Sequence, residues 1–235
     1  MIQTENGTIR ETIRDIPVYG EYDVVVAGGG MAGCGAALAA GKRGLRVLLL
    51  EAYGALGGLA TLGLVNIPLD FVSGMGCEMM RELDALGGHW HRNTDPETHK
   101  LVLDRMMKKY GVEVLLVTQV VDALLEGNVL RGAVIQTKTG RKCVLAKRFV
   151  DATGDADLAF YAGAETMSGR VEDGMSQACS LEFTMGGVSF SEYLQSDIKK
   201  KDPRWVKTIR EDVESGVLPY APDNHLNWIT HLPGR

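Results

Sequence analysis

Residues 23–51 read DVVVAGGGMAGCGAALAAGKRGLRVLLLE and decide the fold. A run of valines leads into a glycine-rich turn, small residues suited to a helix follow over 31–42, and a second apolar run occupies 46–50. Short apolar runs of this kind are typical of strands buried in a parallel sheet. A strand over 21–27, a helix and a second strand form a βαβ unit, which requires that sheet to be parallel.

The turn after the first strand has the spacing G-x-G-x-x-G, with Gly28, Gly30 and Gly33 as its glycines. In this pattern the first glycine permits the tight turn, the second lets the backbone approach a pyrophosphate, and the third lets the helix pack against the sheet. The phosphates then lie against the N–H groups at the start of the helix. Glu51 ends the second strand 18 residues after Gly33, where its carboxylate can accept hydrogen bonds from ribose hydroxyls and would repel a ribose phosphate. The alternative is a glycine-rich turn without a ligand, but the strand, helix and acid around this turn favour a nucleotide.

The composition is that of a globular protein. The chain has 235 residues, of which 45% are apolar and 23% charged, and a net charge of −5 gives no reason to expect nucleic acid or an acidic membrane surface as a partner. Four cysteines without a C-x-x-C pair argue against zinc and against a disulfide framework. The polar start of the chain is not a secretory signal, and no apolar run approaches the roughly 20 residues of a membrane span. We therefore expect a soluble, cytoplasmic protein of one large or two small domains.

Further elements follow the βαβ unit. We predict helices over 76–86 and 96–110, the second of which begins after Thr94-Asp95 with a proline in its first turn. Strand-like runs at 112–120, 128–137 and 141–153 are separated by pairs of turn-forming residues, as in a β-meander.

The last third of the chain has a different character. A short helix is expected over 155–162, a strand over 178–188, and a charged helix or pair of helices over 190–215, broken near Pro203. We divide the chain into an N-terminal extension at 1–20, a first domain at 21–165 and a partial second domain at 166–235.

Three more blocks of sequence carry a family resemblance. They are EAYGALGGLATLG at 51–63, VDATGDADLAFYAGAE at 150–165 and MSQACSLEFTMGGV at 175–188. Together with the glycine-rich turn, they resemble the FAD-dependent oxidoreductases among the two-dinucleotide-binding flavoproteins, the group related to glutathione reductase and succinate dehydrogenase. The resemblance implies an α/β fold, with a Rossmann-like FAD-binding domain of parallel sheet and β-meander followed by the start of an α+β substrate domain.

The resemblance also implies roles for residues along the FAD. Those implied at the pyrophosphate and the adenosine ribose are Gly28, Gly30, Met31, Ala32, Gly33, Glu51 and Ala52. Gly57, Gly58 and Thr61 are implied along the pyrophosphate and ribityl chain toward the flavin. The backbone of Val120 is implied at the adenine, and Thr153, Gly154 and Asp155 are implied over the phosphate side. Two structural alternatives stay open, since Gly57-Gly58 can be an ordinary flexible loop and Asp155 can be the N-cap of the following helix.

The chemistry implied by the family is hydride transfer between bound FAD and a small organic substrate. Only one dinucleotide fingerprint is present, so a separate nicotinamide domain is absent from this sequence. The catalytic residues are unknown. Candidates are Asn66, Asp70, Ser176 and Gln177, for each of which a structural hydrogen bond is the alternative role.

No metal site is expected. His89-Trp90-His91 places two histidines on one side of a strand, but a polar loop explains them better because no third ligand has a suitable spacing. A covalent histidyl–flavin link is not expected either, since residues 52–72 contain no histidine.

In members of the family, a C-terminal segment after the substrate domain completes the FAD domain. We find no such segment in this sequence. We expect either the N-terminal part of a longer enzyme or a chain completed by a second subunit, and a homo-oligomer is also open. A non-catalytic subunit that binds ADP or FAD is the alternative function. An NAD-dependent dehydrogenase is a third option, against which the A-T-G-D block counts.

Overall fold

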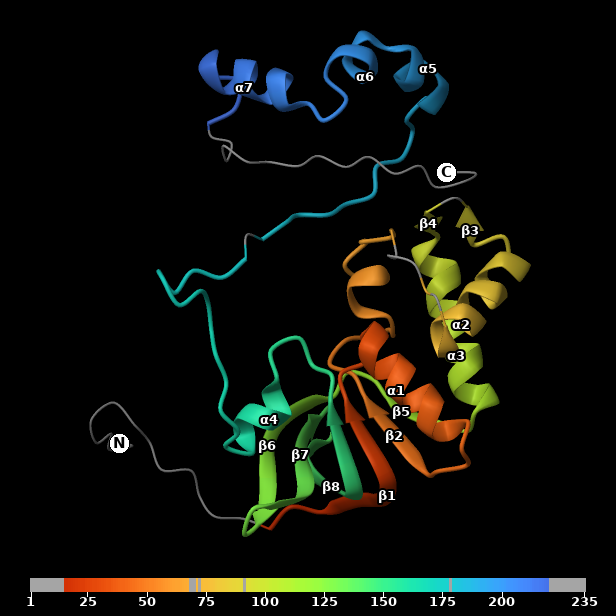
Figure 1. The fold of residues 1–235 in the computed structure, drawn as a ribbon, viewed down its shortest axis with the longest axis vertical. Coiled ribbons are helices and arrows are strands. Elements are labelled where there is room, and N and C mark those ends of the chain that lie inside the picture. Colours follow the sequence, from red (N-terminus) through yellow and green to blue (C-terminus); the bar gives the residue numbers. More distant parts are fainter. Residues whose placement is uncertain (1–14, 68–70, 72, 91, 178, 220–235) are drawn as a thin grey trace.

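The computed structural model describes residues 15–67, 71, 73–90, 92–177 and 179–219 and is built around a six-stranded sheet (Figure 1). The strands stand in the order β5-β2-β1-β8-β7-β6. Neighbours from β5 to β8 are parallel, whereas β8, β7 and β6 form an antiparallel meander. These strands are β1 (Val18–Ala27), β2 (Val47–Leu50), β5 (Glu113–Leu115), β6 (Gln119–Glu126), β7 (Val129–Thr137) and β8 (Gly140–Asp151).

The first βαβ unit consists of β1, α1 (Met31–Gly41) and β2, as the sequence predicts. All four residues of β2 are buried. Leu49 belongs to the core under the helices, while Leu48 and Leu50 pack on the other face with Ile135 of the meander. Burial on both faces explains why this strand is uninterruptedly apolar. The predicted α/β, Rossmann-like fold with a β-meander is confirmed.

Two further helices lie on the same side of the sheet as α1. They are α2 (Gly74–Ala85) and α3 (Pro96–Lys109), which pack against each other and against α1. Asp95 caps α3, since its carboxylate accepts hydrogen bonds from the N–H groups of Glu97 at 2.8 Å and Thr98 at 3.2 Å. A short 3₁₀ helix, η1 (Gly58–Ala60), and a small hairpin of β3 (His89–Trp90) and β4 (Asn93–Thr94) complete this side.

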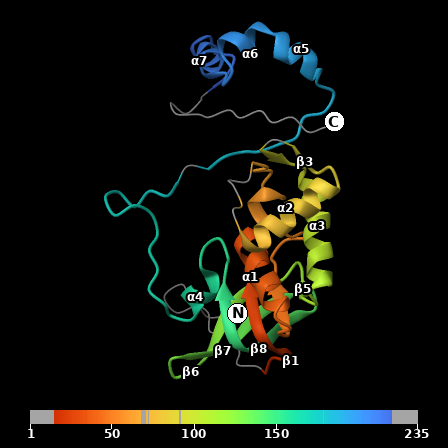
Figure 2. The same ribbon diagram turned by 45° about the vertical axis from the view of Figure 1, so that its right-hand side comes forward.

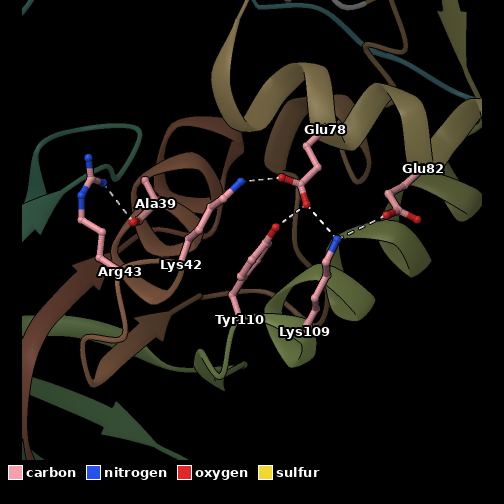
Figure 3. A network of polar contacts seen from close by, with 7 residues as sticks. All are labelled: Ala39, Lys42, Arg43, Glu78, Glu82, Lys109 and Tyr110. Carbon is pink, nitrogen blue, oxygen red and sulfur yellow. Dashed lines mark hydrogen bonds and ion pairs between the residues drawn. The ribbon is translucent and has the colours of Figure 1, made fainter.

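A polar cluster joins the C-terminal ends of α1 and α3 to α2 (Figure 3). The Glu78 carboxylate on α2 receives hydrogen bonds from Lys42 at 3.0 Å, from Lys109 at 2.9 Å and from the Tyr110 hydroxyl. Only 13% of the Glu78 side chain is exposed. The hydrogen bonds from Lys109, Tyr110 and Lys42 lower the pKa of Glu78 to about 2, so one carboxylate holds the ends of α1 and α3 against α2.

The run at 112–120, predicted as one strand, forms parts of two. Glu113–Leu115 extends the parallel sheet beside β2, and the chain then leaves the sheet before β6 begins at Gln119. Val117 marks the break, because its backbone is left-handed with φ 51°. An apolar run of this length does not reveal that its two halves pair with different strands.

The C-terminal part of the described chain packs differently. After α4 (Asp157–Tyr161), residues 164–177 and 179–189 form neither helix nor strand, so the strand predicted over 178–188 is wrong for the described residues. Three short helices follow, on either side of Pro203: α5 (Phe190–Gln195), α6 (Asp197–Lys201) and α7 (Val206–Glu214). These three helices lie apart from the sheet in Figure 1 and in Figure 2. Among the helices of the described residues, none has the length and apolar character needed to cross a bilayer.

Candidate dinucleotide site

The glycine-rich turn lies at the carboxyl end of β1, between β2 and β8. Gly28 has φ 93°, and a Cβ there would lie 2.5 Å from the Ala152 carbonyl oxygen. A Cβ on Gly33 would lie 1.8 Å from the Gly28 carbonyl oxygen. Gly28 therefore requires glycine for the tight turn beside the end of β8, and Gly33 requires it for the close packing of the helix against the strand.

Gly30 differs from these two glycines because it faces open space. Apart from Gly30 itself and its neighbours along the chain, no protein atom lies within 4 Å of the position that its Cβ would occupy. Gly30 is the N-cap of α1, and no side chain in the described residues caps that helix. An uncapped helix start beside an open backbone suits a phosphate group. The adjoining Met31 is partly buried and Ala32 is exposed.

Glu51 lies directly against the turn, although only 6% of the residue is exposed. Its Oε2 accepts a hydrogen bond from the Gly29 N–H at 2.6 Å, and its Oε1 accepts one from the Tyr53 N–H at 2.7 Å. Because a carboxylate oxygen can accept more than one hydrogen bond, both oxygens retain capacity for ribose hydroxyls. Ala52, the neighbour predicted with Glu51, is exposed.

The second glycine pair lies against the first turn. The Gly57 N–H donates to the Gly29 carbonyl at 2.8 Å, and an isolated parallel bridge joins Gly57 to Gly30. The structure thus brings together two turns that are about thirty residues apart in the sequence. Thr61 is fully buried, and its hydroxyl donates to the Leu56 carbonyl at 2.6 Å, so this side chain holds the Gly57-Gly58 turn from inside the protein.

Cys34 of α1 is a further contact of the turn. It is buried, and its thiol donates to the Gly29 carbonyl at 3.1 Å. Burial raises the pKa of the Cys34 thiol to about 12, which keeps it protonated and able to donate. Both backbone groups of Gly29 are therefore bonded, the N–H to Glu51 and the carbonyl to Gly57 and Cys34.

The A-T-G-D block forms a third loop at this edge, anchored by Asp151. The carboxylate of Asp151 accepts hydrogen bonds from the Thr153 N–H at 3.0 Å, the Thr153 hydroxyl at 2.7 Å and the Ala159 N–H at 2.8 Å. The Thr153 hydroxyl accepts one from the Asp157 N–H at 2.8 Å. Sequence reasoning missed Asp151, although an acid at the end of β8, matching Glu51 at the end of β2, was an available signal.

The alternative role for Asp155 as a helix N-cap is wrong, because the N-cap of α4 is Ala156, with φ 57°. Gly154 and Asp155 are both exposed on this loop. Desolvation raises the pKa of Asp157, with further contributions from the nearby Asp155 and Asp151 charges. Val120 lies on β6, partly buried, opposite Ile135 and next to a bulge in the strand pairing.

The catalytic candidates are dispersed. Asn66 is buried, and its backbone carbonyl accepts a hydrogen bond from the Thr94 N–H at 2.8 Å. Ser176 and Gln177 are exposed in the segment after α4, and Asp70 lies outside the described residues. The structure does not bring the described candidates Asn66, Ser176 and Gln177 together at the glycine turns.

The histidine cluster is only partly described. His89 contacts Asp84, with 2.6 Å between Nδ1 and Oδ1, and His91 lies outside the described residues. In the part of the chain that the structure describes, no group of three or more His, Cys, Asp or Glu residues is placed to hold a metal ion.

A groove of about 800 Å³ runs between α1 and α2. Its floor is apolar, with Leu38, Phe71 and Met79 among the lining residues, and Lys42 and Arg81 lie at its rim. The groove reaches Met31 and Ala32 but none of the glycines at 28–30, so it is distinct from the open space at Gly30.

The fold, the two linked glycine turns and the acid beside them define a dinucleotide-binding protein of the Rossmann type. The chain belongs to the FAD dependent oxidoreductase family, whose model matches residues 23–230. This membership confirms the resemblance recognised in the sequence and identifies FAD as the cofactor.

The curated relatives include tRNA-modifying enzymes. The chain is 34% identical over 148 residues to the tRNA uridine 5-carboxymethylaminomethyl modification enzyme MnmG of Alkaliphilus oremlandii, which covers 52% of this chain and 22% of that enzyme. It is 40% identical over 85 residues to MnmG of Pelobacter propionicus, which covers 32% of this chain and 11% of that enzyme. The chain thus matches only about a fifth of these relatives' length or less.

Solved structures share the fold over somewhat more than three fifths of the chain. THI4 of Thermovibrio ammonificans has a TM-score of 0.50 and 25% identity, covering 64% of this chain and 67% of that one. A geranylgeranyl bacteriochlorophyll reductase-like protein of Thermoplasma acidophilum also has a TM-score of 0.50, with 21% identity, and covers 62% of this chain and 43% of that one.

Proposed function

We propose that this chain binds FAD across the linked glycine turns and takes part in hydride transfer between the flavin and an organic substrate. The observation that supports this most strongly is the open space at Gly30 beside an uncapped helix start. A Cβ on Gly28, Gly29 or Gly33 would collide with other protein atoms, whereas Gly30 leaves room for a pyrophosphate.

Different residues bind different parts of the FAD in this proposal. The N–H groups at the start of α1 hold the pyrophosphate, and Glu51 accepts hydrogen bonds from the adenosine ribose while it fixes Gly29. Asp151 shapes the loop of Thr153 and Gly154 over the phosphate side. FAD supplies the two-electron redox chemistry when it is bound, and the protein contributes binding, orientation and electrostatics.

The substrate is the open part of the proposal. We keep the small organic substrate predicted from the sequence, and the net charge of −5 supports it because phosphate-rich partners favour basic surfaces. The similarity to MnmG, an enzyme named for tRNA modification, makes tRNA the second candidate. We also propose that a substrate domain begins near residue 166 and that further protein completes the flavin site.

A substitution at Gly30 tests the placement of FAD. The Gly30 backbone is extended, and no neighbour lies near the new side chain, so Gly30→Val should fold normally and yet block the pyrophosphate. We expect it to lose the flavin absorbance band while its thermal midpoint stays close to that of the wild type. Gly186→Val, at an exposed position that is also open, is the control and should retain the band. A yellow Gly30→Val protein would show that the pyrophosphate binds elsewhere.

Anaerobic mixing distinguishes the two candidate substrate classes and tests whether the flavin takes part in catalysis. The FAD-loaded chain would be mixed with small organic reductants and, separately, the reduced protein with tRNA. Bleaching or return of the flavin band identifies the class that exchanges electrons with the flavin. No change with any of them, when the protein that completes the flavin site is also present, would favour the alternative of a non-catalytic nucleotide-binding subunit.

A further inference from the structure

The groove between α1 and α2 has an apolar floor that is rich in methionine. Met31, Met75 and Met79 line it together with Leu38 and Phe71. Methionine side chains are flexible and polarizable, so they adapt to the shape of a partner and are common at surfaces that bind other helices. The floor therefore has the composition of a surface that receives an apolar helix face.

The side of the groove that α1 contributes is low. Ala32, Gly35 and Ala39 line it. Beyond the neighbouring backbone of α1, no protein atom lies within 4 Å of the position that a Cβ on Gly35 would occupy. The distance between two packed helices depends on the side chains at their contact, so residues this small allow another helix to approach closely.

The rim of the groove is positively charged. Lys42, Arg43 and Arg81 line it and are exposed. Among the described residues that line the groove, the one acid is Glu78, whose carboxylate already receives hydrogen bonds from Lys42 and Lys109 (Figure 3). The groove is thus a basic surface on a protein whose net charge is −5, and it suits an amphipathic segment that carries acids.

The helix α7 is an amphipathic helix whose apolar face has no described partner. Val206, Ile209 and Val213 recur at positions i, i+3 and i+7, which places them on one face of the helix. No residue of α7 is buried. A helix of nine residues is too short to be stable by itself in water, so this face needs another apolar surface.

The helix and the groove are complementary in length, spacing and charge. The nine residues of α7 span about 14 Å, and the groove lies between helices of 11 and 12 residues, which span about 17 and 18 Å. Apolar anchors at i, i+3 and i+7 are the pattern by which a helix binds in a groove. Glu211, Asp212 and Glu214 give α7 three acids against two bases, and Asp212 borders the apolar face because it lies three residues after Ile209.

We propose that α7 of one copy of this chain docks in the groove between α1 and α2 of a second copy, and that two copies exchange α7 reciprocally to form a dimer. The structure holds α7 away from the α1 and α2 of its own chain in Figure 1 and in Figure 2. Residues 164–177 and 179–189, which precede these helices, form neither helix nor strand. A long connection of this kind lets an element pair with another copy at low cost, and a reciprocal exchange gives a closed dimer.

Sedimentation equilibrium of the full chain of 235 residues tests this inference with two variants. Ile209→Gln removes the central apolar anchor of α7, and Gly35→Trp fills the groove. We expect the wild type to form a dimer and each variant to raise its dissociation constant by more than about tenfold, because every contact occurs twice in the dimer. Both variants should keep the wild-type thermal midpoint, since Ile209 is not buried and the position of Gly35 is open.

Two substitutions on the same elements of sequence serve as matched controls. Lys207→Gln introduces the same residue as Ile209→Gln, at a position of α7 whose side chain is 77% exposed. Gly186→Trp introduces the same residue as Gly35→Trp, at an exposed and open position outside the groove. Both controls should dimerise within about twofold of the wild type, because neither touches the proposed contact.

A mixing experiment shows which surfaces meet. Fluorescently labelled Gly35→Trp retains an intact α7, and unlabelled Ile209→Gln retains an intact groove. An excess of Ile209→Gln should therefore bring the labelled chain into a heterodimer, whereas an excess of unlabelled Gly35→Trp should not. A labelled chain with both substitutions lacks the anchor of α7 and should remain monomeric with either partner.

The outcomes decide the proposal. A wild-type chain that stays monomeric would overturn it and leave docking of α7 in its own groove, or of another segment, as the explanation for the two apolar faces. A dimer that both variants retain would also overturn it, because the two copies would then meet through another surface. Failure of Ile209→Gln to recruit labelled Gly35→Trp would contradict the pairing of α7 with the groove.

Discussion

Residues 15–163 and the described residues of 164–219 belong to one chain but differ in how they are packed. The first region contains every residue of the buried core, from Tyr22 to Leu158. In the second region no described residue is buried, and large apolar side chains such as Leu181 are almost fully exposed, at 88%.

The difference shows what a pattern of apolar residues needs in order to become structure. In the first region each apolar face meets another, as β2 does between the helices and the meander. In the second, Leu181, Phe183 and Met185 alternate with polar residues as a strand would, but no described strand lies beside them. Alternation specifies a strand only when a neighbouring strand satisfies its backbone.

The largest expected effect on the free energy of unfolding is that of a substitution at Gly33. Gly33→Ala forces a Cβ to within 1.8 Å of the Gly28 carbonyl oxygen, so β1 and α1 must move apart. We expect a loss of about 4 kcal/mol or more in the free energy of unfolding, at the upper end for single substitutions. Urea denaturation measures it. Gly186→Ala is the control from the other region and should change this free energy by less than about 0.5 kcal/mol. Equal midpoints for the two variants would contradict the packing described at the turn.

The second-largest expected effect on the free energy of unfolding is at a buried leucine, which we compare with an exposed one. Leu103 is fully buried under the helices, so Leu103→Ala should lower the free energy of unfolding by about 3 kcal/mol through lost burial and a cavity. Leu181→Ala, the same change in the exposed segment, should alter it by less than about 0.5 kcal/mol. Chemical denaturation of both variants checks the contrast. A large effect of Leu181→Ala would mean that this segment packs in solution.

The smallest effect is at the polar cluster of Glu78. Glu78→Gln removes the charge that faces Lys42 and Lys109, and we expect a loss of about 1 kcal/mol, because both lysines are half exposed and screened by solvent. Glu211→Gln is the counterpart on α7, where Lys207 lies 3.6 Å away, and should leave the main unfolding transition unchanged.

The effect of Glu78 should depend on pH in a defined direction. Its pKa is lowered in the folded protein from an ordinary 4.5 to about 2, so its stabilisation is complete above pH 4.5 and is lost as the pH falls toward 2. The stability difference between wild type and Glu78→Gln should therefore shrink between these values. Urea midpoints at a series of pH values measure it. A difference that grew on acidification would be the opposite of this expectation.

Local patterns in the sequence predict much of the first region. The glycine spacing, the two apolar runs and the proline and acids before α3 depend on neighbouring residues, and the structure has the βαβ unit and α3 where they indicate. The break at Val117 was not predictable in this way, since it depends on β5 pairing with β2 and β6 with β7. Asp151 and Cys34 were missed for a similar reason, because their contacts with backbone groups form only after the chain has folded.

The sequence alone determined that a strand, a glycine-rich turn and a helix follow one another, because glycine spacing and continuous apolar runs act over short distances. It also carried the motifs of the FAD family. Only the tertiary structure decided that the second glycine pair lies against the first turn and that Glu51 fixes Gly29. These contacts join residues that are far apart in the chain, so their geometry depends on how the whole sheet is assembled.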